Sequence, residues 1–469
     1  MLNLNAMVEI KEGLTFDDVL LVPLLSHVSS RKETNTESNL TPRIKLSIPI
    51  VSANMDTVTG SYMAITMARL GGVGVIHRFN TIEEQVNEVT KVKRAQSVVI
   101  TNPYTVSPDD TLANLKSISA EKGVSSFPVV KGKKLVGIIT KRDYMFEKDD
   151  SKKVSELMSK DLVTASFGIS IEDAKKILAK EKVEKLLLVD KKGRLKGMIT
   201  AKDIALSENS GNITKDKRGR LVVGGAVGIV GDYKERIKAL VDADVDFIVV
   251  DVANGYLEKV AETVRYIKSN YNIDVIAGNV ATKEGVVNLA KAGADAVKVG
   301  IGPGGACLTR SVAGVGYPQL SAIMDCSNAG VPIIADGGIR KSADLAKAIA
   351  AGANTVMIGS LLAGTDESPG FVVTKENKNY KLYRGMASIS AYADKASKLN
   401  EIAEIEGYTP EGTEMLIEYR GSAVKIVNNL VNGLRSAMTY LNARNLDEFR
   451  RNARFVRLTE AGKKESKYE

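Results

Sequence analysis

Short apolar runs alternate with longer stretches of helical periodicity along most of the chain. The first two runs, 48–53 and 73–77, are each followed by a segment whose apolar residues recur every three or four positions. Continuous apolar strands that alternate with helices predict a parallel sheet covered by helices. Six further runs bring the count to eight: 222–230, 247–252, 275–280, 296–301, 332–336 and 355–358. Eight is the number of strands in a closed (β/α)8 (TIM) barrel, which makes an open doubly wound sheet the weaker alternative.

Glycines and polar side chains gather directly after these runs. The ligand face of a (β/α)8 barrel lies where the strands end and the helices begin. Residues at these positions are therefore candidates for a site rather than for a packed core. The segments concerned are 53–56, 77–78, 251–255, 278–279, 300–310, 336–338 and 359–360.

An internal repeat interrupts the alternation after the second unit. The sequence of 135–143, LVGIITKRD, is similar to that of 195–203, LKGMITAKD, which begins sixty positions later. Each copy predicts the order strand, helix, strand, strand, helix. The opening strands of the two copies are expected at 104–106 and 163–165.

The length of 469 residues is too great for one ordinary domain. We expect a barrel formed by 1–96 and 208–469, with the repeat inserted as a separate domain at 97–207. Such an insertion is tolerated in a loop whose ends meet.

The segment 300–310 is the strongest candidate for chemistry. Four of its eleven residues are glycine, so its backbone can approach a ligand closely. Cys307 lies in it, followed by the Thr309 hydroxyl and the Arg310 guanidinium. A thiol on a glycine loop with donors around it is typical of an activated nucleophile, although a small buried thiol in a structural loop is the alternative. Cys326, the second cysteine, lies in a predicted helix and is expected in the core.

Composition narrows the class of protein. Two cysteines cannot form a disulfide framework, which favours a reducing, cytoplasmic location. The apolar runs are too short to span a membrane, and the N-terminus has no signal-peptide pattern. The net charge of +9 fits an anionic small molecule, while the absence of zinc spacing and of aromatic–basic motifs argues against a specific nucleic-acid partner.

The motifs together resemble the inosine monophosphate dehydrogenase/GMP reductase family over nearly the whole chain. The resemblance is carried by 300–310 continuing into 313–319, and by 336–340, 359–360 and 383–388. The inserted repeat resembles paired cystathionine-β-synthase (CBS) motifs. That resemblance implies purine nucleotides as regulatory ligands, held by Thr140 and Asp143 and by Thr200 and Asp203, with a domain that only mediates assembly as the alternative.

The family resemblance implies a role for each candidate residue. Cys307 attacks C2 of a purine nucleotide, and Thr309 and Glu411 manage the proton. Asp336 holds the ribose, and the other nucleotide-binding positions are Gly338, Gly359, Ser360, Tyr383, Gly385, Met386 and Ser388. Asp251, Asn254 and Gly255 are implied for the nicotinamide cofactor, and the carbonyls of Gly302, Gly304 and Cys307 for a monovalent cation such as K⁺. The family usually has a serine that contacts the phosphate where Gly305 stands. The absence of that serine should weaken phosphate binding or leave it to backbone amides.

Local sequences favour the reductase branch of this family. The segments 53–58, 77–79 and 251–256 resemble the reductase versions, and 389–410 contains no arginine for the Arg-Tyr pair of a dehydrogenase flap. The run 454–462 and the paired CBS motifs are instead dehydrogenase-like. The resemblance therefore predicts GMP reductase, which converts GMP to IMP and ammonia with NADPH, in a homotetramer or octamer. The alternatives are IMP dehydrogenase, which oxidises IMP to XMP with NAD, and a nucleotide sensor with an inert barrel.

Overall fold

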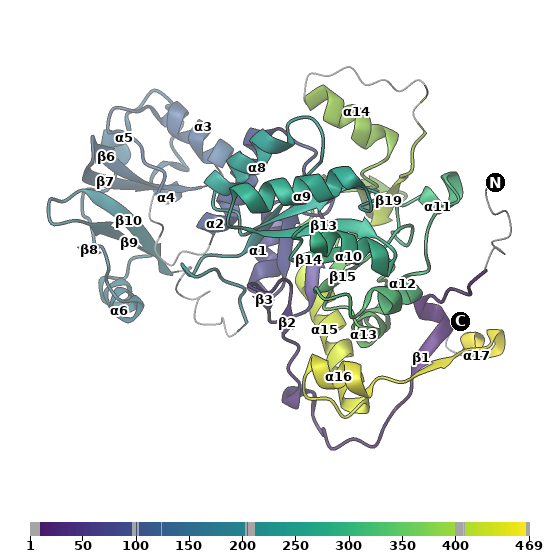
Figure 1. The fold of residues 1–469 in the computed structure, drawn as a ribbon. Coiled ribbons are helices and arrows are strands. Elements are labelled where there is room, and N and C mark those ends of the chain that lie inside the picture. The colour runs from purple at the N-terminus through teal and green to yellow at the C-terminus, as the bar shows by residue number, and fades with distance from the viewer. Residues whose placement is uncertain are drawn as a thin grey trace. The chain divides into compact units, whose positions relative to one another are not determined.

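The computed structural model describes residues 10–95, 100, 103–122, 124–201, 204, 212–398, 407 and 409–465. The chain divides into two compact units (Figure 1). The barrel unit comprises Met1–Lys93 and Asn212–Glu469, and the inserted unit comprises Arg94–Gly211. These limits lie a few residues from the boundaries expected from the sequence.

Eight parallel strands close into a barrel, so the predicted (β/α)8 architecture is confirmed and the open sheet is excluded. The hydrogen-bonded order is β11-β12-β13-β14-β15-β16-β4-β5, with β5 pairing back onto β11. The strands are β4 (Ile50–Ser52), β5 (Val73–Ile76), β11 (Val223–Val227), β12 (Phe247–Asp251), β13 (Asp274–Val280), β14 (Ala296–Val299), β15 (Ile333–Asp336) and β16 (Thr355–Ile358). Most of their residues are buried, as continuous apolar runs require when both faces of a sheet are covered.

Helices surround the strands on the outside of the barrel (Figure 1). The longest, α15, begins at Ser422, whose hydroxyl accepts the amide of Val424 as an N-cap. Its residues Val427, Leu434 and Met438 are buried at the three-to-four-residue spacing of an amphipathic helix. The barrel helices are α1 (Ser61–Arg69), α2 (Ile82–Arg94), α8 (Tyr233–Asp242), α9 (Glu258–Asn270), α10 (Lys283–Lys291), α12 (Gln319–Cys326), α13 (Ser342–Ala350) and α15 (Ala423–Tyr440).

The N-terminal segment closes one end of the barrel. A short hairpin of β2 (Ser38–Asn39) and β3 (Lys45–Leu46) places Leu40 and Leu46 in the same buried cluster as the barrel residues Val51 and Val75. The Thr41 hydroxyl donates to Asp274 at 2.5 Å, at the start of β13. The barrel interior is therefore a packed core, with the site left to the opposite end of the strands.

The two ends of the barrel unit pair with each other. Strand β1 (Val19–Leu21) runs antiparallel to β20 (Phe455–Arg457), seen in Figure 1 as the purple and yellow segments side by side. Phe16 and Val19, at this end of the barrel unit, are buried. The remaining short elements are the 3₁₀ turns η1 (Phe16–Asp18) and η2 (Arg31–Glu33), and α11 (Thr309–Val312), α16 (Leu446–Asn452) and α17 (Glu460–Glu465).

A three-stranded antiparallel sheet, not predicted from the sequence, lies between β16 and α15 along the chain. It consists of β17 (Val373–Lys375), β18 (Lys378–Arg384) and β19 (Glu414–Glu418), in that order. Helix α14 (Ile389–Lys398) begins the connection from β18 to β19. The connection returns Glu411 and Gly412 to the cysteine loop, where Gly412 pairs with Cys307.

The inserted unit has two copies of one pattern. The first contains α3 (Leu112–Lys122), β6 (Ser126–Lys131), β7 (Lys134–Thr140) and α4 (Lys141–Tyr144), and α5 (Val154–Leu157) follows it. The second contains β8 (Thr164–Ser166), α6 (Ile171–Glu181), β9 (Lys185–Val189) and β10 (Leu195–Thr200). The opening strand predicted at 104–106 is wrong, because only Val106 pairs, through one bridge to Val129, before a turn closed by Ser107 and Asp110.

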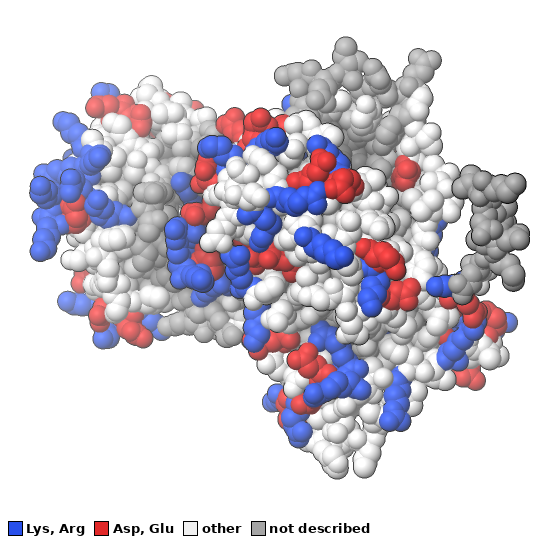
Figure 2. All heavy atoms as spheres, in the orientation of Figure 1, with Lys and Arg blue, Asp and Glu red and all other residues white. Residues whose placement is uncertain are grey.

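Charge is mixed over the face of the molecule that Figure 2 shows, with blue and red side chains interspersed on the barrel unit. This distribution agrees with a solvated, lysine-rich surface rather than a continuous basic stripe. Among the described residues, no helix is both long enough and apolar enough to cross a membrane.

Replacement of 94–211 by a short Gly-Ser linker should leave a folded barrel. The ends of the insertion meet, because Lys93 pairs with Asp216 at 2.9 Å, and all eight barrel strands lie outside it. Halving the length of a loop changes its closure cost by only about 0.6 kcal/mol. Circular dichroism and thermal unfolding should show one cooperative transition. Loss of that transition would contradict the independence of the barrel unit.

Candidate active site

A cavity of about 410 Å³ opens at the carboxyl ends of the barrel strands. Its wall combines residues in or just after β4, β5, β12, β13, β14, β15 and β16 with residues of the added sheet and its connection. Ten predicted site residues line it: Asp251, Gly302, Gly304, Cys307, Thr309, Asp336, Tyr383, Gly385, Met386 and Glu411.

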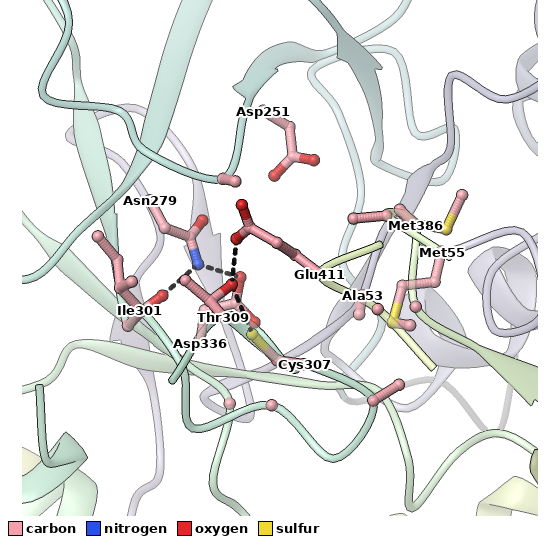
Figure 3. Close-up of a pocket in the computed structure, with 18 of the residues that line it drawn as sticks. Ala53, Met55, Asp251, Asn279, Ile301, Cys307, Thr309, Asp336, Met386 and Glu411 are labelled. Atoms are coloured by element: carbon pink, nitrogen blue, oxygen red, sulfur yellow. Dashed lines mark hydrogen bonds between the residues drawn. The ribbon is translucent and has the colours of Figure 1, made fainter. Parts of the chain in front are cut away.

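Cys307, Thr309 and Glu411 form one hydrogen-bonded chain at the cavity wall (Figure 3). The Cys307 thiol donates to the Thr309 hydroxyl at 3.3 Å, and that hydroxyl donates to Oε2 of Glu411 at 2.7 Å. A nucleophile, a hydroxyl and a carboxylate in hydrogen-bond sequence can move a proton away from the nucleophile.

The backbone around Cys307 fixes this chain. Gly300 has φ +147°, and a Cβ there would lie 2.1 Å from the Asp336 carbonyl, so the loop cannot carry a side chain at its entry. Two backbone bonds join the loop to the segment after α14. Leu308 N donates to Glu411 O at 2.7 Å, and Thr413 N donates to Ala306 O at 3.0 Å. The carboxylate of Glu411 is thus held beside the thiol although the two residues are far apart in the sequence.

Lys298, which the sequence analysis missed, connects two predicted site residues. Its ammonium donates to Asp251 and, at 3.2 Å, to Oδ2 of Asp336. Burial disfavours the charge on Lys298, but the two carboxylates reverse that effect and raise its pKa. Burial likewise opposes ionisation of Asp251, and the Lys298 ammonium outweighs it and lowers the pKa of that carboxyl.

Asn279 and Arg78 also line the cavity and were noted only as polar strand ends. Asn279 Nδ2 donates to Gly300 O at 2.8 Å and to Asp336 Oδ2 at 3.0 Å (Figure 3). The Oδ1 of Asn279 is buried and accepts no bond from the described part of the chain. The Nε of Arg78 is also buried, and it donates no bond within that part of the chain. Burial lowers the pKa of Arg78, whose charge Asp251 offsets. Both residues line the cavity, although these two atoms are themselves buried.

Three of the predicted nucleotide-binding positions, Gly359, Ser360 and Tyr383, lie close together beside Gly305. A Cβ on Gly305 would contact Ser360 at 3.5 Å, and one on Gly359 would lie 3.4 Å from the Tyr383 hydroxyl. A serine side chain at 305 would therefore point to Ser360 and Tyr383. Glycine at 305 removes that hydroxyl from this group of residues. Burial raises the pKa of Tyr383 to about 12, so this hydroxyl is a neutral hydrogen-bond donor at neutral pH.

Other predicted residues do not line the cavity. Ser388 is buried and its hydroxyl accepts the Ala391 amide, which caps α14. Gly338 packs near Phe16, Gly255 donates to Asn279 O at 2.6 Å, and Asn254 is exposed and closes a turn with Tyr256. These four contacts position the loops that carry cavity residues.

The remaining predictions concern residues for a monovalent cation and for a regulatory nucleotide. Gly302, Gly304 and Cys307 share one loop, in which the Gly304 carbonyl already accepts the Cys307 amide at 3.1 Å and keeps one lone pair. The monovalent cation stays a prediction. In the inserted unit, Thr140 donates to Asp143 through both its amide and its hydroxyl. Asp203 lies outside the described residues.

A second charged cluster ties α14 to β18. Arg384, at the end of β18, donates to Asp56 at 2.9 Å through Nε and pairs with Asp394 of α14 at 2.7 Å. Burial opposes the charge of Arg384, and the hydrogen bond to Asp56 nevertheless raises its pKa. His77, one of the predicted strand-end residues, is buried, which lowers its pKa to about 4 and keeps it neutral.

Comparison with known proteins identifies the class to which this fold and site belong. The family model for the IMP dehydrogenase / GMP reductase domain matches residues 13–469. The chain belongs to this family of purine nucleotide oxidoreductases, as its motifs predicted.

Its relatives carry both family names. It is 52% identical over 468 residues to inosine-5'-monophosphate dehydrogenase of Aquifex aeolicus, covering 98% of this chain and 95% of that protein. It is 48% identical to the protein of the same name from Nitrosopumilus maritimus, covering 98% of each. Among solved structures, GMP reductase of Trypanosoma brucei in a cysteine-to-alanine variant with GMP is similar, with a TM-score of 0.91, 42% identity and 98% of each chain covered.

Iodoacetamide should distinguish the two cysteines. Cys307 lies at the cavity, whereas burial raises the pKa of Cys326 to about 12, so that about one Cys326 thiol in 10⁴ is ionised at pH 8. We expect Cys307 to be alkylated at least about 100-fold faster at this pH, as followed by peptide mass spectrometry. The Cys326→Ala variant should keep the rate at Cys307. Equal labelling of both thiols would contradict the assigned environments.

Proposed function

We propose that the protein is a GMP reductase, which uses NADPH to convert GMP to IMP and ammonia. The observation that carries the proposal is the Cys307–Thr309–Glu411 chain, in which a thiol, a hydroxyl and a carboxylate are joined at 3.3 and 2.7 Å. These groups can both prepare the nucleophile and manage the proton that the departing amino group requires.

The first step is attack by Cys307. As the Cys307 thiol loses its proton through the Thr309 hydroxyl, the Glu411 carboxylate accepts it and the thiolate is free to attack C2 of the purine. Asp336 is placed to accept hydroxyls of the ribose, because its two side-chain bonds within the described chain both end on Oδ2. Ribose binding would orient C2 toward the sulfur.

The second step removes the amino group. The protonated Glu411 returns its proton through Thr309 to the C2 nitrogen, which leaves as ammonia while the purine stays bonded to sulfur. In the overall exchange, one hydride and one proton are consumed, a C2–H bond replaces the C2–N bond, and breakage of the C–S bond restores the thiolate. The same carboxylate thus serves as base and then as acid.

The cavity fits a nicotinamide. A carboxamide needs both an acceptor and a donor, and the side chains of Asn279 and Arg78, which line the cavity, carry groups of those two kinds. Asp251, Val252 and Ala253 complete that wall. When bound there, NADPH supplies the hydride that replaces the amino group. Asn254 and Gly255 support the wall through the turn that they form.

IMP dehydrogenase is the second candidate, because the relatives at 48% and 52% identity carry that name. That reaction must hydrolyse the sulfur adduct and therefore needs a base for water. The segment 389–410 contains no arginine, and Lys398 donates to Phe79 O at 3.3 Å. A lysine ammonium at the surface is charged at neutral pH and is a poor base. Glu411, already joined to Thr309, favours the reductase.

We further propose regulation by purine nucleotides at the inserted unit. The closest support is that Trypanosoma brucei GMP reductase was solved with guanosine 5'-triphosphate, in a structure to which this chain is similar with a TM-score of 0.81 and 39% identity over 96% of its length. A homotetramer or octamer, a cytoplasmic location and a monovalent cation belong to the same proposal.

The Glu411→Gln variant should lose GMP-dependent oxidation of NADPH. The amide cannot accept the thiol proton, so kcat should fall by about 10²-fold or more, while the neighbouring backbone bonds from Leu308 and to Ala306 remain. The decrease in absorbance of NADPH at saturating GMP measures the rate.

The Cys307→Ala variant is the matched control, since it should abolish turnover and still bind GMP. Unchanged kcat in Glu411→Gln would remove the proposed acid and base. Turnover in Cys307→Ala would exclude covalent chemistry altogether.

A further inference from the structure

We propose that Lys298 is a positioning residue that couples binding of the purine nucleotide to binding of the nicotinamide dinucleotide. It contacts Asp336 on the nucleotide side of the cavity and Asp251 on the dinucleotide side. This inference rests on the proposed function for the assignment of those two sides, and it holds for either direction of the reaction.

A gap in the strand between them allows Lys298 to reach Asp251. Lys298 lies in β14 and Asp251 in β12, and Gly278 of β13 stands between them in register with both. A Cβ on Gly278 would lie 2.7 Å from the Lys298 Cβ and 2.7 Å from its carbonyl oxygen. Any side chain at 278 would therefore obstruct Lys298. Glycine at this position allows the ammonium of Lys298, which belongs to β14, to bond carboxylates of both β12 and β15.

The bridge compensates the charges of all three groups. The Lys298 side chain is 2% exposed, and an ammonium at that depth is strongly destabilising unless it is paired. Asp251 and Asp336 are 22% and 21% exposed, so each also faces the cavity. Without Lys298 the two carboxylates would repel each other, and the one that accepts a proton would stop acting as a charged acceptor.

Coupling follows because one ammonium is shared. Lys298 and Asn279 both bond Oδ2 of Asp336, and Oδ1 is left for a ligand. When ribose hydroxyls donate hydrogen bonds to Asp336, the bond between Asp336 and Lys298 weakens. The bond between the Lys298 ammonium and Asp251 then becomes stronger. The nucleotide thereby orders the dinucleotide side, and linkage requires the reverse effect to be equal.

The test measures that coupling as the ratio of the dissociation constants for nucleotide without and with dinucleotide. Two pairs in which no hydride can be transferred, GMP with NADP⁺ and XMP with NAD⁺, are titrated by calorimetry. In the unmodified protein we expect a ratio of about 5 or more in at least one pair. Lys298→Met should bring that ratio to about 1, and Lys298→Arg should restore part of it.

A second buried lysine provides the control. Lys93 is 5% exposed and also bridges two carboxylates, Asp216 at 2.9 Å and Asp246 at 2.7 Å, away from the cavity. Lys93→Met should lower the melting temperature and leave the coupling ratio unchanged. If it reduced the ratio as much as Lys298→Met, general loss of stability would explain both and the proposal would fail.

The pH dependence gives a second readout. Lys298 lowers the pKa of Asp251, so its removal raises that pKa. As the pH falls, Asp251 should therefore become protonated at a higher pH in Lys298→Met than in the unmodified protein. The affinity for the dinucleotide should be lost at that higher pH. Arg78, the other cation that faces Asp251, is still present, so the shift is smaller than for an isolated carboxylate pair.

The outcomes separate this inference from the proposed function. Coupling with XMP and NAD⁺ but not with GMP and NADP⁺, lost in Lys298→Met, would support the inference and contradict the reductase. A ratio of 1 in the unmodified protein, or a full ratio in Lys298→Met, would overturn the inference. If Lys298→Met does not fold, Asp251→Asn replaces it. That variant must also lose the coupling while it retains affinity for the nucleotide alone, and failure to do so overturns the proposal.

Discussion

Closure of eight parallel strands is the constraint on which the rest of the structure depends. Because every strand runs the same way, all carboxyl ends meet at one rim, and residues from 53 to 412 of the sequence line a single cavity. The opposite end is filled by Leu40 and Leu46 of the N-terminal hairpin. The rim carries polar groups at little cost to the core, since their partners are one another rather than the apolar interior.

Chemistry at this rim depends on two long-range attachments. Backbone bonds between 306–308 and 411–413 place a carboxylate beside the thiol, and Lys298 ties Asp251 to Asp336. In the proposed reaction, the first attachment favours one fate of the sulfur adduct over the other. A carboxylate that reaches the leaving nitrogen through Thr309 favours loss or addition of ammonia, whereas hydrolysis needs a base beside water, and 389–410 contains no arginine to serve as one.

The alternation of apolar runs was enough to predict the barrel, and the strand limits differ from the structure by only a few residues, since continuous burial leaves a clear periodic signal. The prediction of a strand at 104–106 was wrong because three residues that favour strands do not reveal whether a partner strand extends alongside them. Cys307, Thr309 and Asp336 could be predicted from a glycine-rich motif. Lys298 could not, because a lysine within an apolar strand shows its role only once Gly278 and two carboxylates are brought beside it by register.

The most direct test of the central claim is the product formed from IMP and an oxidised dinucleotide, resolved by chromatography with and without ammonium. A reductase run in reverse returns its adduct to GMP only when ammonia is present, because Glu411 and Thr309 serve the nitrogen and not water. The account predicts ammonium-dependent GMP with both NADP⁺ and NAD⁺ offered, and at most a trace of XMP. Sustained formation of XMP at a rate independent of ammonium would contradict it.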